Sequence, residues 1–245
     1  MDPIRVAVIG LGGWNPAILR AVSQDETMDV VGVSEYDPQR LESFVAKCGE
    51  VEAFGDSRQM VLQTKPDVVF LSIPPASGVA ALEFLAAQGI AVFKPAPLAR
   101  NLTEAAQVVR MFRDRDLPLG VGNPRRAMES YRALLDDAAE GVSSVRAELV
   151  TQIKLPMGWR GDCQSAGGGV LLYSGLEMLD ILIEVAGLPE SVYAAIQTDR
   201  PASGDTTTPV HDTDDTVMAV LHSGTNPIGQ LYATRRGGES REWIE

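Results

Sequence analysis

The stretch VIGLGGWNPAIL, residues 8–19, contains the features that decide the fold of the first half of the chain. An apolar run over residues 4–10 ends in a turn that holds Gly10, Gly12 and Gly13, and a helical pattern follows. Glycines between a strand and a helix permit a tight turn and a close approach of the backbone to a ligand. The free N–H groups at the start of the helix suit a pyrophosphate. The stretch therefore predicts a dinucleotide site, and an ordinary turn without a ligand is the alternative.

Further residues extend this expected site. Asn15 replaces a third glycine, and together with Pro16 it favours the start of a helix, although Pro16 removes one N–H from the anion-binding set. Glu35 ends the second apolar run, where a carboxylate accepts hydrogen bonds from ribose hydroxyls and repels a 2′-phosphate, which favours NAD over NADP. The prolines of LSIPPAS predict either a cofactor-facing loop or a rigid structural turn. The residues that we expect to bind the cofactor are Gly10, Leu11, Gly12, Gly13, Trp14, Asn15, Glu35, Ile73, Pro74 and Pro75.

Residues 1–122 alternate short apolar runs with amphipathic stretches. Strands that are apolar on both faces and separated by helices predict parallel β-α-β units, and hence an α/β Rossmann domain with a doubly wound parallel sheet. The expected strands cover residues 4–10, 28–34, 68–72, 91–94 and 119–122, and the expected helices cover residues 16–23, 38–48, 79–88 and 101–114.

Residues 123–245 have a different pattern, in which strands are grouped around a single long helix. This grouping predicts an α+β second domain with an open, mostly antiparallel sheet. The sequence SREWIE at residues 240–245 predicts the start of a further strand, so we expect a truncated sheet with an exposed edge. The other expected strands cover residues 144–153, 191–197, 216–222 and 228–235, and the expected helices cover residues 131–139 and 170–185.

A polar stripe runs along the otherwise apolar helix at residues 170–185. Tyr173, Glu177, Asp180 and Glu184 have helical spacing that places them on one face. The stripe follows a run of glycines, and it predicts either the lining of a cleft or the solvated face of a core helix.

Composition excludes several classes of function. The net charge of −12 argues against nucleic acid as a partner, because phosphate binding needs a basic surface. No apolar run reaches the ~18 residues of a membrane span, and the start of the chain does not resemble a signal peptide. The two cysteines are too few for a disulfide framework, which predicts a cytoplasmic protein. With two histidines and no cluster of metal-ligating residues, we expect no metal site.

The order and spacing of several motifs resemble the Gfo/Idh/MocA family, named for glucose–fructose oxidoreductase and inositol dehydrogenases. The resemblance implies an NAD(P)-binding Rossmann domain, a second domain whose open sheet forms a homo-oligomer interface, an active site between the two domains, and a sugar, cyclitol or related polyol as the small-molecule substrate. The motifs are RVAVIGLGG, VVGVSEYDPQRL, DVVFLSIPP, PLAR, VGNPRRAMESYRAL and WRGDCQSAGGGVLLYSGLEMLDIL.

The chain departs from the family pattern at the positions to which the resemblance assigns proton transfer. A Glu-Lys-Pro turn is usual after the fifth strand, and in the ungapped register, which we prefer, Ala96 takes the place of its lysine. The alternative register places Lys94-Pro95 on the motif, but it requires a two-residue deletion and a later insertion. Tyr173 and Glu177 take the places of an Asp and a His on the long helix, and Gly78 replaces a histidine that commonly follows the two prolines. Lys94, two residues before Ala96, would point to the same face of a strand and could replace the lost amine. The alternative is a lysine whose stem packs while its head group reaches solvent.

Two functions remain open. The first is an NAD(P)-dependent oxidoreductase with remodelled proton-transfer groups, in which Lys94, Tyr173 and Glu177 are the catalytic candidates and Arg160 and Asp180 the substrate-binding candidates. The second is a catalytically silent dinucleotide-binding or scaffold subunit of the same family. Whether the chain is an enzyme depends on which groups replace the lost lysine and histidine.

Overall fold

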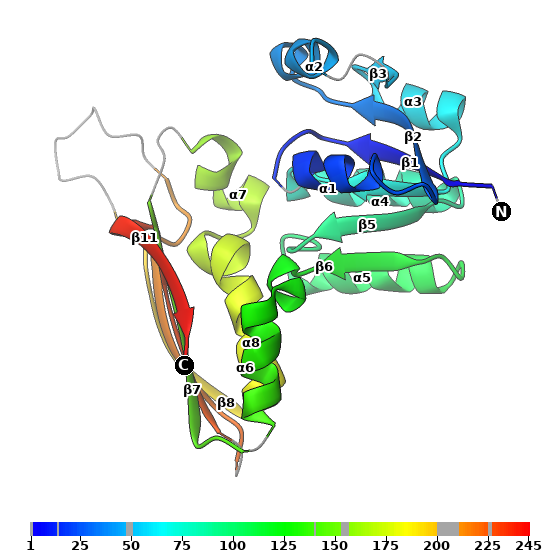
Figure 1. Cartoon of the computed structure of the whole chain (residues 1–245). Helices are drawn as coiled ribbons and strands as arrows, with labels where there is room; N and C mark the ends of the chain where they lie inside the picture. The colour runs from blue at the N-terminus through cyan, green and yellow to red at the C-terminus, as the bar shows by residue number, and fades with distance from the viewer. Residues whose placement is uncertain are drawn as a thin grey trace, which may run out of the picture. The chain divides into compact units, whose positions relative to one another are not determined.

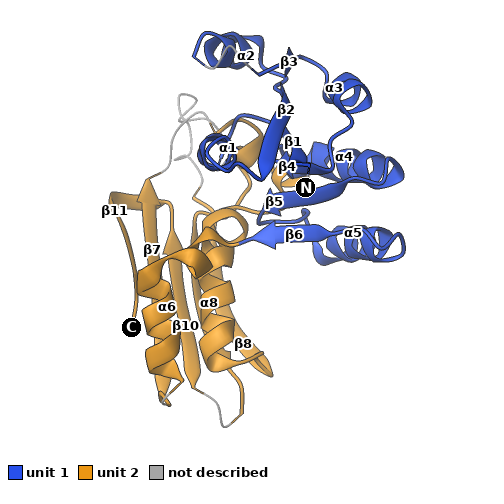
Figure 2. Cartoon of the chain, turned by 45° about the vertical axis from the view of Figure 1, so that its right-hand side comes forward, with its two compact units in different colours: residues 1–122 blue, residues 123–245 orange. Residues whose placement is uncertain are grey.

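The computed structural model describes residues 2–13, 15–47, 51–139, 141–152, 157–199, 211–224 and 227–245. The chain divides into two compact units, residues 1–122 and residues 123–245 (Figure 2).

Unit 1 contains a six-stranded sheet in which every pair of neighbouring strands is parallel. The strand order is β3-β2-β1-β4-β5-β6, so the chain reverses its direction of travel across the sheet between β1 and β4. This confirms the predicted doubly wound sheet, and the reversal is the place where such sheets bind ligands. The strands are β1 (Ile4–Ile9), β2 (Met28–Ser34), β3 (Ala53–Phe54), β4 (Val68–Leu71), β5 (Ala91–Pro95) and β6 (Leu119–Gly122).

Helices cover both faces of this sheet. Figure 2 shows α1 on one side of the strands and α3, α4 and α5 on the other. Fully buried apolar side chains from the strands and helices fill the core, among them Val69, Leu71, Leu82 and Phe112. The helices are α1 (Asn15–Val22), α2 (Pro38–Val45), α3 (Ser57–Thr64), α4 (Pro75–Ala87) and α5 (Leu102–Arg113).

The elements of unit 1 differ from the sequence-based expectation in two places. Helix α4 begins at Pro75 rather than at residue 79, because proline is well suited to the first position of a helix. The sequence analysis did not predict β3 and α3. Asp56 caps α3 by accepting hydrogen bonds from the backbone N–H groups of Arg58 and Gln59, and this cap is the signal that could have located the helix.

Unit 2 contains a five-stranded mixed sheet with the order β11-β7-β10-β9-β8. Only the β10–β7 pair is parallel, which confirms a mostly antiparallel sheet. Figure 1 shows α6 and α8 against one face of the sheet. The strands are β7 (Ser144–Gln152), β8 (Ser191–Gln197), β9 (Thr216–His222), β10 (Ile228–Thr234) and β11 (Arg236–Ile244). The helices are η1 (Pro124–Ala127), α6 (Glu129–Ala138), η2 (Gly158–Gly161), α7 (Cys163–Ala166), η3 (Leu171–Gly175) and α8 (Leu176–Ala186).

Two elements of unit 2 were predicted incompletely. The long apolar helix is not uniform, because it opens with a π-helical turn, η3, before the α-helical part, α8. Strand β11 begins at Arg236, four residues before the predicted start at residue 240, and its polar first half gave no apolar pattern. Glu148 on β7 accepts a hydrogen bond from Arg241 at 2.7 Å, a contact between strands that a sequence pattern does not contain.

Candidate cofactor site and proton-transfer residues

The glycine turn after β1 is shaped by close packing against the end of β4. Gly10 has φ of +83°, and a Cβ atom there would lie 2.2 Å from the carbonyl oxygen of Ser72. Gly13 has φ of +58°, and its Cβ would lie 3.0 Å from Ser72 Oγ. Only glycine fits both the backbone conformation and the space at Gly10. The turn therefore has the shape that the sequence predicted for it.

Asn15 takes part in this turn differently from expectation. Its side chain is fully buried, and Nδ2 donates to the carbonyl oxygens of Ile9 at 3.1 Å and Gly10 at 2.7 Å. Helix α1 begins at Asn15, as the Asn15-Pro16 pair predicts, but the Asn15 side chain does not cap it: the amide fastens the turn to the end of β1. Trp14, which we also expected at the site, lies outside the described residues.

Glu35 follows β2, and its carboxylate binds the backbone of the glycine turn. One carboxylate oxygen accepts from the backbone N–H of Leu11 at 2.8 Å, and the other accepts from the backbone N–H of Asp37 at 3.0 Å. Glu35 is 8% exposed, so the carboxylate is anchored in the loop. Each carboxylate oxygen has a second lone pair, and a ribose hydroxyl can donate to it.

Three further candidates follow β4, the strand that neighbours β1: Ile73, Pro74 and Pro75. Ile73 Cγ2 would lie 3.2 Å from a Cβ on Gly10. The structure thus gathers the described cofactor candidates at the carboxyl edge of β1, β2 and β4, next to the strand reversal. This is where open α/β sheets bind ligands.

Lys94 is buried on β5, with 4% of the residue exposed. Its Nζ donates to the carbonyl oxygen of Pro95 at 3.2 Å and to that of Pro97, the two residues that flank Ala96. Burial lowers the pKa of the Lys94 amine to about 8. The alternative in which the head group of Lys94 reaches solvent is therefore wrong, since the amine folds back onto the turn.

Tyr173 lies in the π-helical turn of unit 2. Its hydroxyl donates to the carbonyl oxygen of Ala166 at 2.6 Å, and its ring packs edge-on against Trp159. Burial raises the pKa of Tyr173 well above its ordinary value, although the nearby charge of Arg160 works in the opposite direction. A phenol with a raised pKa keeps its proton at neutral pH, so Tyr173 can donate a hydrogen bond but is a poor base.

The rest of the polar stripe contacts two arginines that the sequence analysis did not single out. Arg125 on η1 forms an ion pair with buried Glu177 and a bidentate pair with Glu242 on β11, at 2.8 and 2.6 Å. Arg126 pairs with Asp180 at 2.6 Å and with Glu184 at 2.9 Å.

Neither of the two roles expected for the stripe, the lining of a cleft or the solvated face of a core helix, describes these contacts fully. Glu177 is 6% exposed and is therefore not on a solvated face. Hydrogen bonds from Arg126 lower the pKa of Asp180, which keeps this carboxylate charged. The adjacent arginines in the sequence NPRRAM were the signal that could have suggested these pairs.

Arg160 lies on η2, near Tyr173. Its guanidinium carbon stands 4.3 Å from the centre of the Trp159 ring, and its carbonyl oxygen accepts from Thr213 Oγ1 at 2.9 Å. Arg160 and Tyr173 therefore belong to one cluster in unit 2. Asp180, the other substrate candidate, belongs to the ion-pair group with Arg126.

The loop at residues 211–215 holds this cluster in place and was missed by the sequence analysis. The Asp214 carboxylate accepts from the backbone N–H groups of Gly169 and Leu171, and the Asp214 carbonyl accepts from Val170 N–H at 2.9 Å. Asp215 binds Arg235 at 2.6 Å and His211 at 2.8 Å. The loop thus fixes the start of the long helix.

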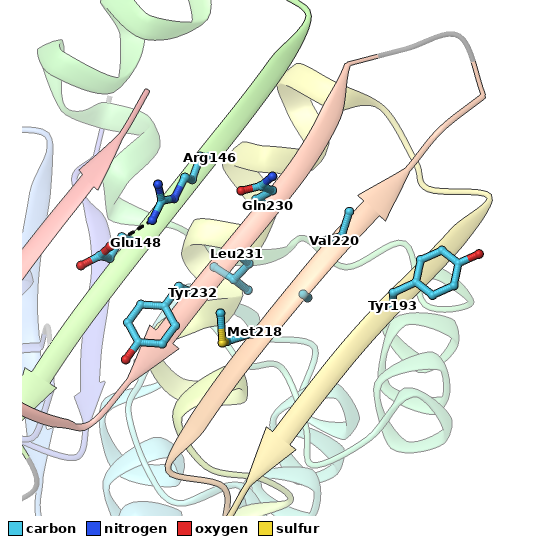
Figure 3. A pocket seen from close by; sticks show the side chains of 9 residues that line it. Arg146, Glu148, Tyr193, Met218, Val220, Gln230, Leu231 and Tyr232 are labelled. Atoms are coloured by element: carbon cyan, nitrogen blue, oxygen red, sulfur yellow. Dashed lines mark ion pairs between the residues drawn. The ribbon is translucent and has the colours of Figure 1, made fainter.

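A shallow groove lies on the open face of the unit 2 sheet (Figure 3). Its volume is about 330 Å³, and Tyr193, Met218 and Val220 supply its exposed apolar part. Arg146 and Glu148 form an ion pair at one side of the groove.

In the described part of the chain, no helix is long and apolar enough to cross a bilayer, and no cluster of residues is suited to a metal ion.

Residues 4–123 match the model of an oxidoreductase family with an NAD-binding Rossmann fold, and residues 132–245 match the C-terminal domain of the same GFO/IDH/MocA family. Together the two matches cover nearly the whole chain. The chain belongs to the Gfo/Idh/MocA family of oxidoreductases, as the motifs predicted.

Among curated proteins, D-apiose dehydrogenase of Rhizobium rhizogenes is 24% identical over 144 residues, which cover 58% of this chain and 42% of that protein. Among solved structures, GenD2 from gentamicin A biosynthesis in complex with NAD aligns with a TM-score of 0.87 at 19% identity, over 100% of this chain and 69% of its own. Levoglucosan dehydrogenase aligns with a TM-score of 0.85 at 20% identity, over 100% of this chain and 70% of its own. The match to the curated relative thus spans less than half of that protein, and the structures share the fold.

Proposed function

We propose that this protein is a nicotinamide-dinucleotide-dependent oxidoreductase acting on a sugar, cyclitol or related polyol, with Lys94 as its proton-transfer group. The glycine turn, Glu35 and the residues after β4 would hold the dinucleotide, which supplies hydride-transfer chemistry when bound. The sugar dehydrogenases among the relatives support this class of substrate.

The buried amine of Lys94 is the observation that carries the proposal. Oxidation of an alcohol needs a group that takes the hydroxyl proton and titrates near the working pH. The pKa of about 8 meets the second requirement, and the amine lies against the turn that bears Ala96. In its neutral form the amine has a free lone pair, so Lys94 can accept a proton and pass it on.

A panel of sugars and polyols tests the proposal, with NADH and NADPH formation followed by absorbance. We expect turnover with a member of the panel and a loss of at least about 100-fold in kcat for Lys94→Met, because general acid–base groups contribute 10²–10⁴-fold. Lys47→Met, which removes an exposed lysine of the same unit, is the control and should leave the rate unchanged. Equal rates for the two variants would refute the role of Lys94.

A second candidate is a dinucleotide-binding subunit without catalysis. It is favoured because the two other catalytic candidates already have partners within the protein. Glu177 is paired with Arg125, and the Tyr173 hydroxyl donates to the carbonyl oxygen of Ala166. Calorimetric titration with NAD and NADH separates the two functions. Binding without turnover of any polyol in the panel would support the silent subunit.

We also propose that the open face of the unit 2 sheet joins copies of this chain into a homo-oligomer. Tyr193 and Met218 are 72% and 59% exposed on this face. Large apolar side chains gathered on one exposed face are typical of protein–protein contacts.

A further inference from the structure

Strand β8 forms one edge of the unit 2 sheet (Figure 3). Among the described strands it pairs only with β9, so the backbone groups on its outer side are open to another strand. Its register with β9 runs without a bulge, and its sequence SVYAAIQ contains no proline and no charged residue. Bulges, prolines and charged side chains are the features that commonly keep an edge strand from pairing with another chain. β8 has none of them.

The side chains of β8 on the helix side of the sheet are exposed. Val192 lies opposite Leu221 of β9, and Ile196 lies opposite Val217. Residues directly opposite each other share a face of the sheet. Leu221 and Val217 are 4% and 1% exposed, whereas Val192 and Ile196 are 54% and 60% exposed. The layer of buried side chains on this face therefore stops at β9 and leaves an apolar row on β8 uncovered.

We propose that β8 pairs antiparallel with β8 of a second copy of this chain, about a two-fold axis at Ala194, so that the two sheets join edge to edge. This register places Val192 opposite Ile196 of the second copy, and β-branched apolar residues make favourable pairs across strands. The two-fold axis makes this pair occur twice. The exposed row is then covered by the same row of the second copy, on the face opposite to the one that bears Met218.

The charges of the chain favour a second copy at this strand. With a net charge of −12, two copies repel each other over much of their surfaces, and an uncharged strand avoids this repulsion. In the proposed register Glu190, the charged residue next to β8, falls opposite Thr198, and Asp199 falls opposite Pro189, so no carboxylate faces another. Because the contact is one strand wide, we expect weak and reversible pairing that a covalent cross-link can trap.

Disulfide trapping tests the register. In a chain that carries Cys48→Ser and Cys163→Ser, Ala194→Cys places a thiol on the two-fold axis, where opposed Cα atoms lie about 4.5–5.5 Å apart and a disulfide can form. Val192→Cys is the control, because it is exposed on the same row but its two thiols would lie roughly 13 Å apart along the strand. Under mild oxidation with diamide, non-reducing electrophoresis should show at least about tenfold more dimer for Ala194→Cys, since pairing raises the effective concentration of its thiols.

Two further variants complete the test. Val192→Cys/Ile196→Cys sets thiols opposite each other and should cross-link, although neither single variant does. Ala194→Cys combined with Met218→Glu should cross-link as well as Ala194→Cys alone, because the edge contact does not use the open face.

Three outcomes would overturn the proposal. Equal cross-linking of Ala194→Cys and Val192→Cys would indicate random collision, and absence of dimer from both Ala194→Cys and the double-cysteine variant would show that the edge does not pair with a second copy. Loss of the cross-link on adding Met218→Glu would assign the contact to the open face instead.

Discussion

At the scale of single residues, Lys94 shows how burial changes the chemistry of a side chain. The sequence places this lysine on a strand, but its contacts with the carbonyl oxygens of Pro95 and Pro97 come from the path of the turn that follows. Desolvation favours the neutral amine and lowers its pKa from 10.5 to about 8.

This pKa predicts a dependence of stability on pH. The unfolded chain holds the Lys94 proton up to about pH 10.5, whereas the folded protein releases it near pH 8. The unfolded chain therefore binds more protons in this window, so the free energy of unfolding should rise as pH increases from about 8 to 10.5, by about 3 kcal/mol at most. Urea unfolding at several pH values should show this rise in the Lys47→Met control and lose it in Lys94→Met. A rise that persists in Lys94→Met would contradict the shifted pKa.

Neighbouring arginines provide a second residue-scale prediction. Arg125 pairs with Glu177, whose side chain is 7% exposed, whereas Arg126 pairs with Asp180, whose side chain is 40% exposed. Arg125→Met leaves a buried carboxylate without its partner and should lower the free energy of unfolding by about 3 kcal/mol or more. Arg126→Met breaks exposed pairs and should cost about 0–1 kcal/mol. Urea denaturation of both variants measures the difference, and equal losses would refute the contrast.

At the scale of elements, the loop at residues 211–215 determines how the long helix of unit 2 begins. Asp214 satisfies the backbone N–H groups of Gly169, Val170 and Leu171, which an isolated helix start would leave without partners. Thr213 donates to the carbonyl oxygen of Arg160, so the same loop positions Arg160 and the start of the helix that bears Tyr173.

Gly169→Ala tests how closely the loop at residues 211–215 packs against the start of the helix. A Cβ at Gly169 would lie 2.0 Å from the Asp214 carbonyl oxygen, so the loop must move away from the helix start. We expect the free energy of unfolding to fall by about 2–3 kcal/mol, as for other overpacked sites. Gly238→Ala, where a Cβ would meet nothing within 4 Å, should be close to neutral. Thermal unfolding of the two variants gives the comparison; a neutral Gly169→Ala would show that the loop is not packed against the helix.

At the scale of the whole molecule, one face of the unit 2 sheet carries the helices α6 and α8, and no described helix covers the other (Figure 1). Side chains alternate along β9, so that Val217 and Leu221 are buried under the helices while Met218 and Val220 are exposed. An apolar open face of this kind gives the proposed oligomer its contact surface.

Met218→Glu should therefore dissociate the proposed oligomer. A charge in the centre of an apolar contact must be buried without a partner, which costs more than the contact gains. Sedimentation velocity should show the mass of a single chain for Met218→Glu and a larger mass for the wild type. Met128→Glu introduces the same charge at an exposed position away from the sheet and should leave the mass unchanged. A wild-type protein that sediments as a single chain would refute the proposed interface.

The sequence by itself determined most of the strands and helices, the doubly wound sheet and the glycine turn. These features depend on local periodicity and on backbone conformations that only glycine adopts readily, as at Gly10, and both can be read from neighbouring residues. The short strand β3 and the polar first half of β11 gave no such periodic signal.

Only the tertiary structure decided the burial and the interaction partners of the candidate site residues. The pairing of Glu177 with Arg125, the anchoring of Glu35 by Leu11 and the approach of Arg40 to Gly12 join separate parts of the folded chain. The Lys94 amine contacts only the turn next to it, but its burial also depends on the folded chain around it. The charge and reach of an ionisable group depend on burial and on partners that folding brings together, and such partners have no fixed spacing in the sequence.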